Sequence, residues 1–247
     1  MGLVAAFALA PGLAVGSFLN VVAARVPLRR SIVSPPSACM SCTQEIAWHD
    51  NIPLVSWLLL HGRCRSCGAG IPVRYPAVEL VTGLLVAGSV WRFGLTADAA
   101  IAAFFCIVLV AVSATDIEHR IIPNRIVLPA AAIVFAANTA VHPSLEWTIG
   151  GLAAFGFLFA AALAYPAGMG MGDVKLALLM GLALGRTVSV ALMIGMVAAL
   201  VPGVVLLAKH GQAARKMRIP FGPFLALGSV VALFAGHELL HVYWSLA

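Results

Sequence analysis

The sequence predicts an all-α polytopic membrane protein with about eight transmembrane helices and a small cytoplasmic loop domain. Hydrophobic residues make up 62% of the 247 residues and charged residues 10%, against about 45–50% and about 25% in soluble domains. Because a soluble core cannot hide so much apolar surface, most of it must face lipid. The second observation is a series of apolar runs, at residues 3–24, 77–91, 97–115, 126–141, 147–165, 174–185, 187–208 and 219–236.

The first run has no basic segment before it and is closed by Arg25, so we interpret it as a retained span and not as a removable signal peptide. A full span needs about 20 residues, and the sixth run, 174–185, is shorter than that. If all eight runs span and the N-terminus lies outside, all but two of the 15 Lys and Arg residues fall on the inner side. This bias is typical of multi-pass inner membrane proteins. A re-entrant sixth run would move residues 209–218 outside and remove the bias.

The net charge of +6 fits basic loops held at an anionic lipid surface. Since the cations are spread over short loops, we expect membrane lipid as a partner and no nucleic acid. Residues 27–76 are the long polar segment of the chain. The predicted division is therefore a first transmembrane helix (1–26), a cytoplasmic domain (27–76) and a transmembrane core (77–247).

The polar segment holds two C-x-x-C motifs, Cys39 with Cys42 and Cys64 with Cys67. Two such motifs predict a tetrahedral zinc site with four thiolate ligands. Two disulfides are the alternative, which a reducing cytoplasm disfavours. Four sulfur ligands leave no open position on the metal, so the predicted role of the zinc is structural. Cys106 lies in an apolar run and is interpreted as a packed hydrophobic residue.

The chain has four aspartates, and two of them fall where a predicted span meets the cytoplasmic side. Asp50 is in the polar loop, and Asp98 has a simple interpretation as a helix cap. Asp116 ends the third run, where the helix dipole disfavours a carboxylate, so capping does not explain it. An acidic residue at the membrane is a functional hypothesis by default, and Asp116 and Asp173 are the candidates.

Asp173 follows Gly168-Met-Gly-Met-Gly172, and its simplest interpretation is an N-cap of the sixth run. The alternating glycines favour more than that, because they predict an extended, open backbone to which a substrate peptide could pair. Gly170, Gly172 and Lys175 are therefore candidates for the active-site loop. Lys175 either tunes the carboxylate or reaches toward lipid phosphate, and the second interpretation is the simpler one.

Two carboxyl groups that share one proton can hydrolyse a peptide bond. The ionised group activates water and the protonated group polarises the carbonyl, since two like charges a few Å apart resist joint ionisation. Glu118 and His119 follow Asp116 and are alternatives for acid–base work, although either could simply be solvated.

The ordered motifs of the chain resemble those of the type IV prepilin peptidases, which are membrane aspartic proteases with a G-x-G-D signature. The matching segments, in chain order, are Gly16-Ser-Phe-Leu-Asn20 with Arg25 and Pro27, Pro35-Pro-Ser37, Arg74-Tyr-Pro76 with Glu79, Asp116-Ile-Glu-His-Arg-Ile-Ile-Pro-Asn124, Gly170-Met-Gly-Asp173 with Lys175, and Pro220-Phe-Gly-Pro223. The set covers nearly the whole chain, whereas G-x-G-D alone would be a weak signal.

The resemblance implies that Asp116 and Asp173 are the catalytic pair. It implies that the substrates are precursors of type IV pilins or pseudopilins, cut on the cytoplasmic side of the bacterial inner membrane just after the glycine that ends a short basic leader. Members that carry the four cysteines also methylate the new N-terminus with S-adenosylmethionine, whose binding residues this sequence does not identify.

Two other functions remain open at this stage. A membrane transporter also carries intramembrane carboxylates and broken helices, but its acids would be expected near the midplane and not at one face. A zinc-bearing scaffold of a secretion system would tolerate replacement of both aspartates.

Overall fold

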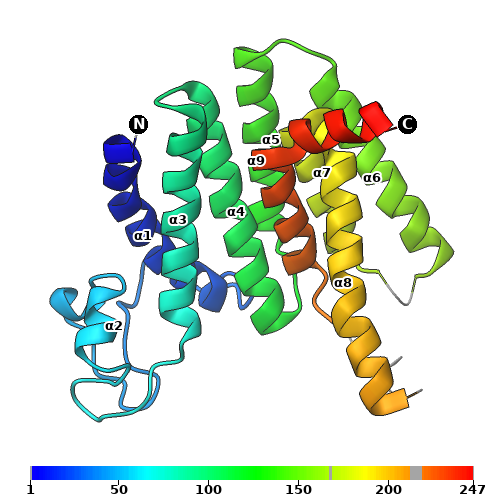
Figure 1. Cartoon of the computed structure of the whole chain (residues 1–247). Coiled ribbons are helices and arrows are strands. Elements are labelled where there is room, and N and C mark those ends of the chain that lie inside the picture. The colour runs from blue at the N-terminus through cyan, green and yellow to red at the C-terminus, as the bar shows by residue number, and fades with distance from the viewer. Residues whose placement is uncertain (1, 167–168, 212–218, 247) are drawn as a thin grey trace. The chain divides into compact units, whose positions relative to one another are not determined.

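The computed structural model describes residues 2–166, 169–211 and 219–246, and within these ranges the chain is helical, with isolated bridges but no extended strand. The helices are α1 (Gly2–Arg25), α2 (Val55–Leu59), α3 (Arg74–Phe93), α4 (Ala97–His119), α5 (Asn124–Val141), α6 (Glu146–Ala164), α7 (Met171–Leu184), α8 (Val188–His210) and α9 (Gly222–Leu246) (Figure 1). Two short 3-10 helices lie at Trp48–Asn51 and Gly185–Thr187. The all-α prediction is confirmed.

The described residues contain seven segments that are long and apolar enough to cross a membrane. All of the long helices contribute to them, because α7 and α8 fall within one segment of 39 residues, Met171–Lys209. The chain is therefore a multi-pass membrane protein. The short sixth apolar run of the sequence corresponds to α7, which has 14 residues and is about 21 Å long. Gly185 has a φ of +55° and separates α7 from the turn that leads to α8.

The chain divides into two compact units, Met1–Ala114 and Thr115–Ala247. In the first unit, α1 and α3 lie side by side (Figure 1). A Cβ atom added to Gly16 would lie 2.7 Å from the Cα of Glu79, and one added to Gly12 would lie 2.9 Å from the Cα of Gly83. Small residues let helix backbones approach closely in a membrane, and Gly12 and Gly16 allow this approach between α1 and α3.

In the second unit, α7 packs against α5, α6 and α9. Its buried residues lie on all sides of the helix, as expected for an apolar helix surrounded by others. At the α6 crossing, a Cβ on Gly181 would collide with the backbone of Gly150. Near the end of α7, Asn138 of α5 is buried and donates to the Leu182 carbonyl at 2.9 Å. These contacts fix α7, and with it the segment that carries Asp173.

Candidate active site and zinc module

Asp116 lies three residues before the end of α4. The helix ends at His119 because Arg120 takes a φ of +54°, while its N–H still donates to the Asp116 carbonyl at 2.8 Å. Pro123 then precedes α5 in an extended conformation. The Asp116 residue is only 6% exposed. A carboxylate at the carboxyl end of a helix receives no stabilisation from that helix, so another group must support it.

Asp173 lies in the first turn of α7, where the helix dipole favours a carboxylate. The N-cap position is held by Gly170, so the interpretation of Asp173 as the cap is wrong. The prediction of an extended glycine stretch is also wrong for Gly172, which is helical, because α7 begins at Met171. Gly170 is extended as predicted, and Gly168 lies outside the described residues.

Ile122, in the link between α4 and α5, lies between two glycines. A Cβ on Gly172 would lie 2.9 Å from the Cβ of Ile122, and one on Gly222 would lie 3.4 Å from its Cδ1. Gly172 precedes Asp173, so this packing brings the start of α7 to the segment that follows Asp116. The two carboxyl groups lie within electrostatic reach of each other.

Gly222, the first residue of α9, supplies the support that Asp116 lacks. Its N–H donates a buried hydrogen bond of 2.9 Å to Asp116 Oδ2, and a Cβ at Gly222 would lie 2.9 Å from the same oxygen. Only a glycine lets the backbone approach the carboxylate this closely. In the sequence, Pro220-Phe-Gly-Pro223 stands out only as a family motif, and nothing in it indicates that Gly222 donates to Asp116.

Three other polar residues, Lys175, Glu118 and His119, are close in sequence to the two aspartates. Lys175 Nζ donates to Asn124 Oδ1 at 3.0 Å, which ties the start of α7 to the start of α5. Neither predicted role of Lys175, tuning the carboxylate or reaching lipid phosphate, included this bond. His119 Nε2 lies 3.9 Å from Glu118 Oε1 and has no hydrogen-bond partner among the described residues. Glu118 and His119 therefore keep their place as alternatives.

The two C-x-x-C motifs fold in the same way. In the first, the Cys39 N–H donates to the Gln44 carbonyl at 2.9 Å and the Thr43 N–H donates back to Cys39 at 3.0 Å. In the second, the Cys64 N–H donates to the Ala69 carbonyl at 2.8 Å, and the Gly68 N–H donates to the Cys64 carbonyl at 2.9 Å. Thr43 and Gly68 both take a positive φ, of 57° and 71°, which turns the chain after each motif.

The four cysteine sulfurs lie within 4.8 Å of one another, a geometry suited to one metal ion. The Cys39 and Cys67 Sγ atoms are 3.8 Å apart, far beyond a disulfide bond. Zinc–sulfur bonds of about 2.3 Å place two tetrahedral ligands about 3.8 Å apart. Backbone N–H groups of Cys42 and Ser41 lower the pKa of the Cys39 thiol to about 6, which favours a thiolate ligand. The cluster thus fits the predicted zinc.

Three further interactions stabilise this zinc module, residues 27–76, and the helices next to it. Arg65 donates to both carboxylate oxygens of Asp50 at 2.6 and 2.7 Å and lowers the pKa of that carboxyl. Glu79 of α3 is buried, and its Oε2 accepts the Leu54 N–H at 2.8 Å, just before α2. Asn20 of α1 donates to the Tyr75 carbonyl at 3.2 Å.

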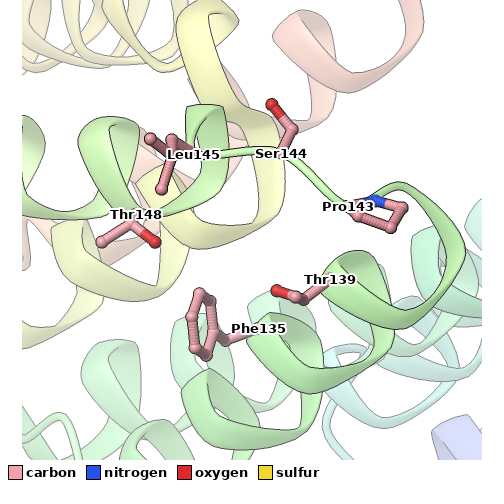
Figure 2. Close-up of a pocket in the computed structure, with 6 residues that line it drawn as sticks. All are labelled: Phe135, Thr139, Pro143, Ser144, Leu145 and Thr148. Carbon is pink, nitrogen blue, oxygen red and sulfur yellow. The ribbon is translucent and has the colours of Figure 1, made fainter.

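A hollow of about 400 Å³ lies at the turn between α5 and α6 (Figure 2). It is lined by Phe135, Thr139, Pro143, Ser144, Leu145 and Thr148. None of these side chains titrates near neutral pH, and the turn is at the end of α5 opposite to Asn124, the partner of Lys175. The hollow is therefore not the site of the acids.

Comparisons with known proteins agree with the ordered motifs. Residues 103–207 match the family described as the Type IV leader peptidase family, and residues 11–93 match the Bacterial Peptidase A24 N-terminal domain. A Prepilin leader peptidase/N-methyltransferase of Bacillus subtilis is 35% identical over 240 residues, which cover 96% of each chain. The chain belongs to the type IV leader peptidase family. A protein of the same name from Pseudomonas aeruginosa is 34% identical over 268 residues, 96% of this chain and 92% of that one.

No solved structure matches this type IV leader peptidase family member significantly. The two family matches fall on different parts of the site described above. The N-terminal match contains all four cysteines and Glu79, and the second match contains Asp116 and Asp173. Gly222 lies beyond the second match, at the start of α9.

Proposed function

We propose that this chain is an aspartic endopeptidase that removes the leader of type IV prepilin or pseudopilin precursors, cutting after a glycine at the cytoplasmic face of the membrane. The observation that supports the proposal is the packing of Ile122 against Gly172, which precedes Asp173 in α7, and against Gly222, whose N–H donates to Asp116 of α4. The two acids lie within electrostatic reach, and the Gly222 N–H orients one of them. The names of the relatives supply the substrate class.

The reaction needs one ionised and one protonated carboxyl group. In the proposed mechanism, the ionised group takes a proton from a water molecule as that water attacks the scissile carbonyl, and the protonated group donates to the carbonyl oxygen. Each group has a local source of stabilisation for its charged form, the Gly222 N–H for Asp116 and the α7 N-terminus for Asp173. We infer a single shared proton and do not assign it to either residue.

Connectivity and charge support a cytoplasmic position for the acids. A three-residue link, 94–96, joins α3 to α4, so the start of α3 and the end of α4 lie on the same side if both helices span. The zinc module precedes α3, and the acids follow on that same side. All but two of the Lys and Arg residues fall there as well, although residues 212–218, which hold three of them, lie outside the described residues. Positive residues mark the cytoplasmic side.

A pilin precursor carries an apolar helix after its cleavage site and would sit in the same bilayer. Lateral binding against the apolar helices of this chain would place the scissile bond at the interface where the acids lie. Orientation of this kind lowers a reaction barrier by several kcal/mol when the geometry is good. Membrane lipid is thus part of the working environment, and the proposal requires no nucleic acid.

We further propose that the chain methylates the new N-terminal amine, with S-adenosylmethionine as the methyl donor. The names of the relatives include this activity, and the four-cysteine cluster that accompanies it in the family is present. Cys39, Cys42, Cys64 and Cys67 would hold a zinc ion. With four thiolate ligands the ion would stabilise the fold of the module and take no part in the chemistry.

The test is leader cleavage of a prepilin in membranes by wild type, Asp116→Asn and Asp173→Asn. Asn keeps the size of the side chain and removes the acid. Both variants should insert normally and lose cleavage. Cleavage at the wild-type rate by either one would exclude the acid pair and favour a transporter or a zinc-bearing scaffold.

Methylation is tested separately, by the gain of one methyl mass on the cleaved product when S-adenosylmethionine is added.

A further inference from the structure

The short helix α2 of the zinc module has one face that is fixed to the rest of the module. Ser56 is buried, and its hydroxyl donates to the His49 carbonyl at 2.8 Å and accepts the Ile52 N–H at 3.0 Å. Trp57 donates to the Ile71 carbonyl at 3.2 Å. These bonds account for the inner side of α2 and set its orientation.

The other face of α2 is apolar and open. Val55, Leu58 and Leu59 are 49%, 65% and 74% exposed. Their spacing of i, i+3 and i+4 places them on one side of the helix. In a module this small, exposed leucines at adjacent helical positions are unusual unless another apolar phase covers them.

The hydrogen bond to α3 gives the level of this face relative to the membrane. The Leu54 N–H, directly before α2, is held by Glu79, five residues after α3 begins at Arg74. Five helical residues correspond to about 7 Å along the axis. The 20 residues of α3 cover about 30 Å, the thickness of the hydrocarbon layer. Figure 1 accordingly places α2 next to the first turns of α3.

We propose that the face formed by Val55, Leu58 and Leu59 docks into the interfacial layer of the lipid bilayer. Interfacial helices bury their apolar side about 5–10 Å into the boundary between headgroups and acyl chains, which is the level that Glu79 sets for α2. The module offers the matching charge for anionic headgroups, with exposed arginines at Arg29, Arg30 and Arg63. Trp48, in the 3-10 helix next to α2, is 82% exposed, and tryptophan favours the membrane interface.

This docking has a consequence for the module. The hydrogen bond of Glu79 attaches it to α3, and Asn20 of α1 bonds the first turn of α3 at Tyr75. The α2 face would add a contact with lipid beside those helices. The hydrogen bonds and the lipid contact together would hold the cysteine cluster at a fixed height above the bilayer surface. The inference depends on α3 spanning the membrane and is independent of the peptidase activity.

The experiment uses the full-length protein with the photoreactive residue p-benzoylphenylalanine placed at Leu58 or, separately, at Leu59. The control position is Met40, which is 90% exposed in the first cysteine motif. The variants are reconstituted in vesicles of phosphatidylethanolamine and phosphatidylglycerol, irradiated, and digested for mass spectrometry. Zinc content equal to that of the wild type establishes that each variant is folded. Two α2 positions are used so that the test remains possible if one variant does not fold.

We expect lipid-mass adducts at Leu58 and Leu59, several-fold more abundant than at Met40. Equal labelling of all three positions would overturn the proposal, since the α2 face would then not be the docking surface. Absence of lipid adducts at the α2 positions would also overturn it. Adducts that join two copies of the chain, or the chain and an added prepilin, in place of lipid would assign the face to a protein partner.

Discussion

Replacement of Gly222 by alanine tests whether the Gly222 N–H positions the Asp116 carboxylate. A Cβ at this residue would lie 2.9 Å from Asp116 Oδ2 and 3.4 Å from the Asp116 Cγ. The obstructing oxygen is the end of a side chain, so it can move away without displacing the backbone. That movement weakens the hydrogen bond from the Gly222 N–H, and hydrogen bonds to charged groups contribute about 1.5–3 kcal/mol. Since about 1.4 kcal/mol is a tenfold change in rate, kcat should fall by about 10- to 100-fold.

The assay is leader cleavage in membranes with the prepilin concentration varied, so that kcat and KM are separated. The matched control is Gly203→Ala in α8, where an added Cβ meets nothing within 4 Å. The expected result is a lower kcat for Gly222→Ala with a KM close to that of Gly203→Ala. Equal kcat values for the two variants would refute the argument that this N–H positions a reacting carboxylate.

Three further changes test other parts of the structure. Cys64→Ser should abolish binding of about one zinc per chain and make the zinc module sensitive to protease, whereas a protease-resistant, zinc-free variant would contradict a structural role for the metal. Glu79→Ala removes the acceptor of the Leu54 N–H and should lower the stability of the module by about 1–3 kcal/mol, and Glu79→Gln, which keeps an acceptor oxygen, should recover most of the loss in thermal unfolding. Gly181→Ala should destabilise the α6–α7 crossing by about 1–3 kcal/mol, whereas Gly156→Ala, with open space around it, should have no such effect.

The zinc module could be predicted because the residues that define it lie close together in the sequence. Two C-x-x-C motifs define the cysteine cluster by spacing alone, and each motif folds through hydrogen bonds between residues four or five apart. The prediction of extended glycines before Asp173 failed at Gly172 because α7 starts at Met171, and helix starts are weakly marked where no Ser, Thr, Asp or Asn occupies the cap. The pairing of Lys175 with Asn124 joins residues 51 positions apart, and no periodic pattern indicates it.

The sequence by itself determined that the chain is a helical, multi-pass membrane protein with a four-cysteine cluster and two conspicuous acids. Composition, run length and motif spacing are properties of neighbouring residues, and they suffice for these conclusions. The tertiary structure alone decided that Gly222 donates to Asp116, 106 residues away, and that Glu79 holds the start of α2. Both contacts join residues that are distant in the chain, and their distances are set only when separate segments pack against each other.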